Sequence, residues 1–362
     1  MLAARDRLRA LAPSRGIDFA SNDYLGLAGS GRLRKAALAA VARDVPVGSG
    51  GSRLLRGNHS EHEALEAEAA AHFGCGASLF MATGFAANVA LFATLPQRGD
   101  LVVHDAHVHA SAHDGMRLGR AECVAVPHND AMAFADAIRA WRTRGGTGRP
   151  WIAVESLYSM DGDRAPIDAL AEIADRNDAF LLIDEAHATG VFGDKGRGLA
   201  GHIGARENVV TLHTCGKAIG AEGALICLPR TLRDFMVNRA RPFIFSTAPS
   251  PLIAAIVRDS LRIIGDEPDL RIELARRIER AAHRLQPLGA LATGSQIIPL
   301  ILGDDARAMR VSASLQEAGF DVRGIRPPTV AAGSARLRIS ITLNADGDAI
   351  DALGDALEKA LT

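Results

Sequence analysis

The stretch Phe180-Leu-Leu-Ile-Asp-Glu-Ala-His-Ala-Thr-Gly190 decides the fold. Its first four residues are apolar, and the carboxylate of Asp184 follows them directly. A continuous apolar run of this length is typical of a strand buried on both faces, as in a parallel sheet. Ligands of open α/β sheets bind at the carboxyl ends of the strands, so we expect Asp184 at a binding site. A carboxylate that only caps the following helix is the alternative.

A second strand-like run, Val209-Val-Thr-Leu212, leads into a bend that contains Lys217 between Gly216 and Gly220. The chain has only four lysines among many arginines, so a lysine in this bend indicates a need for an amine. A desolvated lysine amine can attack a carbonyl and form a Schiff base, whereas arginine stays protonated. A loop lysine that reaches into solvent is the alternative.

Lys217 and Asp184 together predict pyridoxal 5'-phosphate (PLP) as the cofactor. PLP needs a lysine for its aldehyde and commonly an aspartate for its pyridine nitrogen, whose protonation makes the ring an electron sink. We expect His187, three residues after Asp184, to lie close enough to reach the ring hydroxyl.

The cofactor phosphate is expected at the turn Thr83-Gly84-Phe85, between a strand over 77–82 and a helix over 86–93. The beginning of a helix presents free backbone N–H groups and the positive end of the dipole to an anion. The glycine-rich stretch over 47–57 is neither GxGxxG nor a P-loop, and we interpret it as a flexible loop that lines a site.

The histidine-rich stretch over 104–113 could suggest a metal site. Its closely spaced histidines follow no recognised zinc-ligand spacing, so we predict no metal. A single histidine from this stretch that stacks on a cofactor ring is the preferred interpretation.

Composition limits the classes of partner. The formal net charge of -1 and the neutral pI give no indication of a nucleic-acid or membrane-surface partner. The four cysteines form no CxxC pair, which favours a reduced, cytoplasmic setting. We find no signal peptide and no apolar stretch long enough to span a bilayer.

Short apolar strands alternate with helices over about 75–230, which predicts an α/β fold with a mostly parallel, doubly wound sheet and a possible antiparallel strand over 223–227. A smaller C-terminal α+β domain is expected to follow. We predict an N-terminal segment over 1–40 with a helix-like lead over 1–18, a large PLP-binding domain over 41–245 and the smaller domain over 246–362. Ser60 to Glu63 has the form of a capping box, and Asp348 is expected to cap the last helix.

Seven stretches, taken together and in order, resemble the α-oxoamine synthases, which are PLP enzymes of the aspartate-aminotransferase fold. The resemblance covers nearly the whole chain. The stretches are Phe19-Ala-Ser-Asn-Asp-Tyr-Leu-Gly-Leu27, Gly48-Ser-Gly-Gly-Ser-Arg53, Thr83-Gly-Phe-Ala-Ala-Asn88, Ser159-Met-Asp-Gly-Asp163, Asp184-Glu-Ala-His-Ala-Thr-Gly190, Thr214-Cys-Gly-Lys217 and Arg326-Pro-Pro-Thr-Val330.

The resemblance implies roles for individual residues around the cofactor. Lys217 matches the Schiff-base lysine, Asp184 the partner of the pyridine nitrogen and His187 the residue near the ring oxygen. His109 matches the histidine that stacks on the ring and takes part in catalysis with Lys217 and Asp184. The remaining matches, all around the cofactor and its phosphate, are Thr83, Gly84, Phe85, Ser159 and Thr214.

The resemblance also implies how substrate and a second subunit bind. Arg338 matches the arginine that pairs with the amino-acid carboxylate, a bidentate task that suits a guanidinium. Thr329 matches a substrate-side contact. Ser246-Thr247 resembles a segment that approaches the cofactor of the partner subunit, so a homodimer with shared active sites is expected.

Within this family, residues 48–53, 57–62 and 326–330 most resemble members that condense L-alanine with pimeloyl-CoA or pimeloyl-acyl carrier protein in biotin biosynthesis. Members that use glycine or serine and other acyl chains remain the first alternative. The second is a catalytically silent subunit of the same fold that only supports a partner, and the third is an α/β protein without a cofactor.

Overall fold

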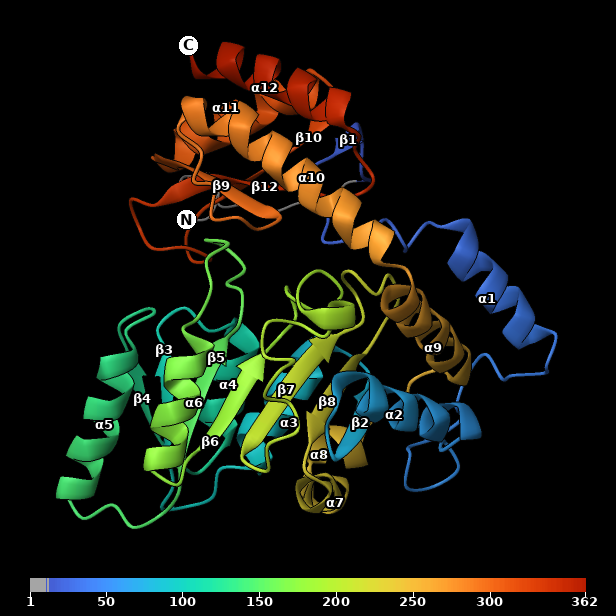
Figure 1. The fold of residues 1–362 in the computed structure, drawn as a ribbon, viewed down its shortest axis with the longest axis vertical. Helices are drawn as coiled ribbons and strands as arrows, with labels where there is room; N and C mark the ends of the chain where they lie inside the picture. The colour runs from blue at the N-terminus through green and yellow to red at the C-terminus, as the bar shows by residue number, and fades with distance from the viewer. Residues whose placement is uncertain (1–10, 12) are drawn as a thin grey trace. The chain divides into compact units, whose positions relative to one another are not determined.

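The computed structural model describes residue 11 and residues 13–362, so most of the helix-like lead predicted over 1–18 lies outside the described residues. The described chain divides into two compact units (Figure 1). The larger unit comprises residues 27–158 and 164–268, and the smaller one comprises the residues up to 26, 159–163 and 269–362.

A seven-stranded sheet forms the centre of the larger unit as it is described, in the order β2-β8-β7-β6-β5-β3-β4 (Figure 1). Strand β8 runs antiparallel to both of its neighbours, and the other pairs are parallel. The predicted fold class is therefore confirmed, and so is the antiparallel strand. The strands are β2 (Ala77–Met81), β3 (Leu101–Asp105), β4 (Glu122–Val126), β5 (Pro150–Glu155), β6 (Phe180–Asp184), β7 (Val209–Thr214) and β8 (Ala224–Leu228).

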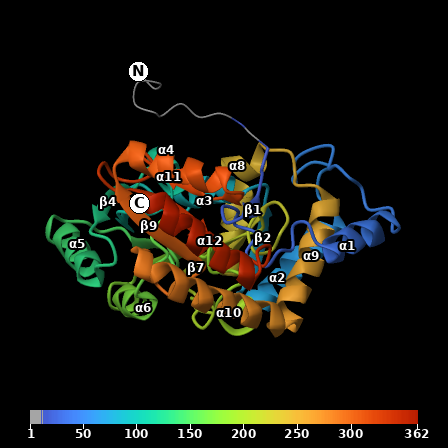
Figure 2. The same ribbon diagram turned by 90° about the horizontal axis from the view of Figure 1, so that it is seen from above.

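Helices cover both faces of this sheet, because side chains along each strand point alternately to opposite sides. In β5, Trp151 and Ala153 pack into one apolar cluster, and Ile152 and Val154 pack into the other. The first cluster contains residues of α3 and α4, and the second contains residues of α5 and α6. Figure 2 labels these four helices. These helices are α3 (Gly84–Thr94), α4 (Ala110–Leu118), α5 (Ala131–Thr143) and α6 (Ile167–Arg176).

The remaining helices of the larger unit include a group that packs together beyond the sheet edge at β2. Helix α9 packs against both α1 and α2. The predicted helical region over 252–286 is interrupted near Glu267, where α9 ends. The helices are α1 (Gly31–Val41), α2 (Ser60–Phe73), α7 (Arg230–Arg239), α8 (Arg241–Ile244), α9 (Pro251–Asp266) and the 3₁₀ turn η2 (Asp194–Gly196).

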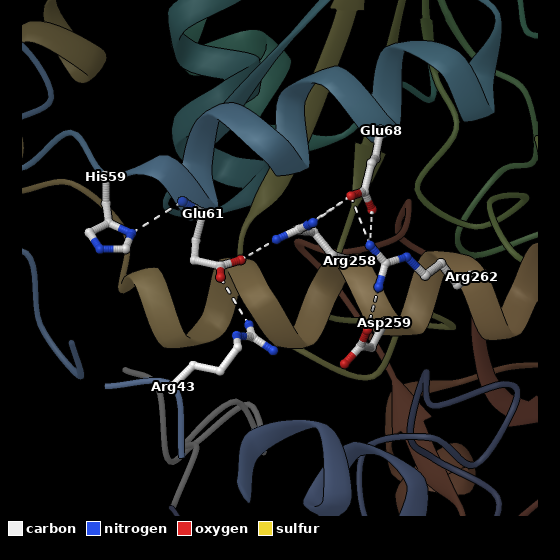
Figure 3. Close-up of polar contacts among 7 residues, drawn as sticks. All are labelled: Arg43, His59, Glu61, Glu68, Arg258, Asp259 and Arg262. Carbon is white, nitrogen blue, oxygen red and sulfur yellow. Dashed lines mark hydrogen bonds and ion pairs between the residues drawn. The ribbon is translucent and has the colours of Figure 1, made fainter. Parts of the chain in front are cut away.

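An ion-pair network joins α2 to α9 (Figure 3). The Arg258 guanidinium donates to Glu61 and, at 2.6 Å, to Glu68, while Arg43 donates to Glu61 from the other side at 2.9 Å. Arg262 reaches Glu68 at 2.8 Å. Residues 246–268 consequently belong with the large sheet, although the sequence placed its domain boundary between residues 245 and 246.

We expect Arg258→Ala to lower the free energy of unfolding by about 2 kcal/mol. The substitution leaves the Glu61 carboxylate, whose side chain is 11% exposed, without its partner on α9. Chemical denaturation at pH 7.5 measures the change. The control is Arg276→Ala, which removes an exposed pair to Glu273 and should cost less than about 0.5 kcal/mol. Equal losses in both variants would contradict a special role for the network.

The N-terminus of α2 differs from the prediction. His59, not Ser60, is the N-cap residue, and its Nδ1 accepts a hydrogen bond from the Glu61 N–H at 3.1 Å. His62, not Glu63, completes the capping box by accepting the His59 N–H at 3.2 Å through Nδ1. His62 Nε2 lies 2.7 Å from the Pro249 carbonyl. An imidazole that accepts at Nδ1 and donates at Nε2 is neutral.

The buried His62 predicts a loss of stability in acid. Burial, with help from Arg53, lowers the pKa of His62 to about 4. The unfolded chain, with an ordinary histidine pKa near 6.5, therefore binds more protons than the folded chain between about pH 6.5 and pH 4. The free energy of unfolding should fall as the pH is lowered through this window, by about 2 kcal/mol between pH 7.5 and pH 5 from this residue.

Urea denaturation of wild type and His62→Asn at pH 7.5 and pH 5 measures how much of the acid-induced loss of unfolding free energy comes from His62. The variant should lose about 2 kcal/mol less than wild type on acidification. His283→Asn, an exposed position on α10 (Pro268–Leu285), should behave as wild type. An unchanged acid loss in His62→Asn would show that His62 is not responsible.

The smaller unit contains an antiparallel sheet in the order β11-β12-β9 and a parallel pair, β1 with β10. Helix α11 packs against this sheet and against α12. Asp346 rather than Asp348 caps α12, since its side chain accepts the Ala349 N–H. Besides α10, the elements are β1 (Ile17–Asp18), η3 (Gln286–Leu288), β9 (Ile297–Gly303), α11 (Asp305–Glu317), β10 (Phe320–Asp321), β11 (Arg323–Ile325), β12 (Ala335–Ser340) and α12 (Gly347–Leu361).

Over the residues that the structure describes, no helix is both long enough and apolar enough to cross a bilayer.

Candidate active site

Asp184 ends β6, and both of its carboxylate oxygens are hydrogen-bonded. Oδ1 accepts the Ala186 N–H at 2.9 Å, and Oδ2 accepts the side-chain amide of Asn88 at 2.8 Å. The side chain is 9% exposed. A buried carboxylate that accepts two donors is held in one orientation. Asp184 therefore does more than cap the following turn.

His109 lies close to Asp184, and both residues line one small cavity together with Asn88 and Glu155. His109 is the N-cap of α4, and its Nδ1 lies 2.7 Å from Ser111 Oγ. Partial burial of the ring lowers the pKa of His109; the Asp184 carboxylate acts to raise it, and Lys217 acts to lower it. Part of His109 remains open to solvent, so a planar ligand can reach the ring.

Lys217 is half-buried in the bend that follows β7. Its Nζ lies 2.7 Å from His187 Nε2, and the His187 side chain is buried. Gly220 adopts φ +72°, and a Cβ there would lie 2.6 Å from the Ala28 nitrogen. Gly220 is thus needed for packing of this bend against the backbone near Ala28.

An anion site is available where α3 begins. The N–H groups of Gly84 and Phe85 have no acceptor within the helix because they belong to its first turn. Thr83 caps the helix, with its Oγ1 accepting the Ala86 N–H at 3.0 Å. A Cβ at Gly84 would lie 2.5 Å from Thr214 Cγ2, so the glycine allows the two residues to lie this close.

The Thr214 hydroxyl is buried, and within the described residues it has no hydrogen-bond partner. An unpaired buried hydroxyl beside a helix N-terminus suits a phosphate oxygen, which can accept from both. The amine of Lys217, the carboxylate of Asp184 and this anion site are the donors and acceptors that PLP requires. The larger unit therefore fits the cofactor that the sequence predicted.

Comparison with known proteins identifies the family. The model of the family "Aminotransferase class I and II" matches residues 14–353. The chain belongs to the aminotransferase class I and II family. Together with the named relatives below, this membership confirms the predicted enzyme class and its PLP cofactor.

Named relatives narrow the family further. The 8-amino-7-oxononanoate synthase of Anaeromyxobacter dehalogenans is 41% identical over 348 residues, which is 95% of this chain and 86% of the relative. The structure of 8-amino-7-oxononanoate synthase from Francisella tularensis has a TM-score of 0.80 and 26% identity, covering 96% of this chain and 98% of that one. Serine palmitoyltransferase from S. paucimobilis, solved with a bound PLP adduct, has a TM-score of 0.87 and 26% identity, covering 94% and 86%.

Three of the site residues predicted for this chain, Ser159, Thr329 and Arg338, lie in the smaller unit. Arg338 is buried on β12, where its Nε donates to the Ser159 carbonyl at 2.6 Å. Its other nitrogens donate to Ser340 Oγ at 2.7 Å and to Asn22 Oδ1 at 3.0 Å. The guanidinium is therefore fixed in orientation by its own unit.

Thr247 is exposed on the segment that follows α8. This segment is joined to the glycine-rich loop, since the Ala248 N–H donates to the Gly51 carbonyl at 2.9 Å and Ser49 Oγ donates to the Pro249 carbonyl at 2.6 Å. The role predicted for Thr247 at a partner's cofactor stays a prediction.

One contact in the site was not foreseen. Asn88 was part of a family stretch, but its contact with Asp184 was not predicted; a single polar residue in the apolar run of α3 was the available signal. For metals, the described residues contain no cluster of three or more His, Cys, Asp or Glu side chains suited to hold an ion.

Proposed function

We propose that the chain condenses L-alanine with a pimeloyl thioester, the reaction of an 8-amino-7-oxononanoate synthase in biotin biosynthesis. The products are 8-amino-7-oxononanoate, CO2 and the free thiol of the carrier. The 41% identity to a synthase of that name over 95% of the chain supports this choice of substrates. One observation supports the chemistry: the Asp184 carboxylate and the Lys217 amine both lie near enough to His109 to shift its pKa.

PLP, when bound, supplies an electron sink for the charge that develops on the alanine Cα. Asp184, held by Asn88 and Ala186, would face the ring nitrogen and keep a proton there. The free amine of Lys217 removes the Cα proton as general base. His187, at 2.7 Å from Nζ, orients that amine.

The positive end of α3 and the Thr214 hydroxyl would hold the phosphate, so that binding energy away from the reacting carbon would fix the cofactor's position. Thr83 maintains this turn by capping the helix. His109 would stack on the ring and limit its movement.

Arg338 binds the carboxylate of alanine, and Thr329 contacts the substrate. Arg338→Lys should raise KM for alanine by about 10-fold or more, because an ammonium cannot reproduce a bidentate pair. Steady-state kinetics with varied alanine measure it. Arg310→Lys, in α11, is the control and should leave KM unchanged. A wild-type KM in Arg338→Lys would remove the assignment.

A homodimer with shared sites is the proposed assembly. The loop over 47–57 and the segment over 245–250 are tied together, and they carry apolar side chains in solvent, including Leu55 at 81% and Phe245 at 70% exposure. Exposed apolar side chains gathered on adjoining loops are typical of an interface. Thr247 would then reach the site of the second copy.

Mixing two inactive variants tests the shared sites. Lys217→Ala and Thr247→Trp, each impaired alone, should regain activity after joint refolding, because mixed dimers contain one site with both native residues. Light scattering gives the mass of the assembly. A monomer, or no recovery on mixing, would contradict the proposal.

Product analysis by mass spectrometry tests the reaction. The purified chain with PLP, L-alanine and pimeloyl-CoA should yield 8-amino-7-oxononanoate, and pimeloyl-acyl carrier protein in place of pimeloyl-CoA identifies the preferred carrier. Three other substrate pairs test the alternative enzymes. Glycine with acetyl-CoA tests for glycine C-acetyltransferase, and glycine with succinyl-CoA tests for 5-aminolevulinate synthase. Serine with palmitoyl-CoA tests for serine palmitoyltransferase. Turnover with one of these pairs but not with alanine would overturn the proposed substrates. Localisation in the cytoplasm remains part of the proposal.

A further inference from the structure

We propose that Asn88 is a positioning residue that holds the Asp184 carboxylate and, through Ser111, keeps the proton of His109 on Nε2. This inference rests on the proposed roles of Asp184 and His109 at the cofactor. It adds a physical link between the acid and the stacking imidazole, which would otherwise be separate parts of the site.

The Asn88 amide joins two elements of the site. It lies in the second turn of α3 with 3% exposure, and its Nδ2 is 2.8 Å from Asp184 Oδ2 and 3.0 Å from Ser111 Oγ. An ionised carboxylate only accepts hydrogen bonds, so the nitrogen and not the oxygen of the amide must face Asp184. Each of its two hydrogens therefore has one acceptor.

Stability alone does not account for an asparagine at this position. The neighbouring buried residues of α3, Ala87 and Leu91, are apolar, and the Oδ1 atom of Asn88 is buried without a partner in the described chain. Leaving a buried carbonyl unpaired costs about 1–3 kcal/mol. A polar residue retained at such a cost indicates a function for its other hydrogen bonds.

Ser111 connects Asn88 to His109 by hydrogen bonds. Its Oγ accepts from Asn88, so its own proton is free to point at His109 Nδ1, 2.7 Å away. The Ser111 backbone N–H also donates to Nδ1, at 3.2 Å. With two donors directed at Nδ1, the neutral imidazole carries its proton on Nε2. The lowered pKa of His109 is consistent with this neutral ring.

Loss of the Asn88 amide should affect both Asp184 and His109. Asp184 would retain the Ala186 N–H but lose the donor to Oδ2. Ser111 Oγ, no longer accepting from Asn88, could rotate to accept a proton from Nδ1 of His109. The Ser111 backbone N–H would still point at Nδ1, but at 3.2 Å it is the longer of the two contacts, so the Nδ1-protonated tautomer would become partly populated.

Nitrogen-15 NMR of histidine-labelled apoprotein measures the tautomer without cofactor or turnover. Wild type should show His109 protonated on Nε2, with the resonance assigned by its loss in His109→Gln. Asn88→Leu should give a mixture, with the Nδ1-protonated form raised several-fold. Thr94→Val, a buried polar position on the same helix, is the control and should leave the tautomer unchanged.

Asn88→Asp gives a second, nearly isosteric test if Asn88→Leu does not fold. Its carboxylate would repel Asp184 when both are ionised and donate to it when one is protonated. The other titratable groups of this cavity are His109 and Glu155. The dissociation constant for PLP, measured by fluorescence quenching, should be about 10-fold weaker than wild type at pH 8 and recover toward it at pH 5.5.

Two results would overturn the inference: an unchanged His109 tautomer in Asn88→Leu, or a wild-type PLP affinity of Asn88→Asp at both pH values. The tautomer does not depend on the reaction catalysed. Failure of the product assay with a confirmed tautomer would therefore count against the proposed function and not against the link itself.

Discussion

Lys217→Ala is expected to lower turnover of alanine and pimeloyl-CoA by about 10⁴-fold or more, because it removes both the attachment point of the cofactor and the general base. The fold should be retained, since the half-buried amine lies at a bend and contributes little to the core. The visible absorbance of the protein-bound cofactor should be lost. Turnover and the absorption spectrum of the purified variant measure both effects.

Lys359→Ala is the matched control, since this lysine is exposed on α12. It should retain wild-type turnover and absorbance. A small primary amine added to Lys217→Ala should restore part of the activity, because it can take the Cα proton in place of Nζ. Unimpaired turnover in Lys217→Ala would mean that another group is the base.

Asp184→Asn is expected to lower turnover by about 10³-fold. The amide occupies nearly the same volume and can still accept the Ala186 N–H, but it carries no charge to hold a proton on the ring nitrogen. The protein should still bind PLP through Lys217. Turnover, with PLP content measured on the same sample, separates a chemical defect from loss of cofactor.

Asp130→Asn is the control for this change. Asp130 caps α5 by accepting the Ala133 N–H at 3.1 Å, and asparagine caps equally well. Turnover should not change. If Asp184→Asn binds PLP and turns over at the wild-type rate, the carboxylate is not the partner of the ring nitrogen.

The strand that ends in Asp184 could be predicted because its signal is local. A continuous apolar run followed by a carboxylate has few other structural interpretations, and the structure places a fully parallel strand there. The same holds for the strand that leads to Lys217 and for the beginning of α3 at Gly84. The resemblance to a known family then supplied the roles, which local patterns alone did not.

Features that depend on contacts between distant segments could not be read in the same way. The capping of α2 by His59 and His62 is one such feature. The His62 ring is held in its capping orientation by a contact with the Pro249 carbonyl, which is far away in the sequence. The Asn88 amide links α3 to β6, and nothing in the sequence spacing of Asn88 and Asp184 indicates that contact. Side-chain hydrogen bonds between elements depend on tertiary packing, which propensity and periodicity do not describe.

The most direct measurement is borohydride reduction of the PLP-loaded protein, followed by proteolysis and mass spectrometry of the peptides. Reduction makes the bond between the cofactor aldehyde carbon and its amine permanent. The phosphopyridoxyl group should be found on the peptide that contains Lys217, and no other lysine should carry it in stoichiometric amount. Modification of Lys35, Lys195 or Lys359 instead, or no stable modification at all, would contradict the assignment of Lys217 as the amine that carries the cofactor.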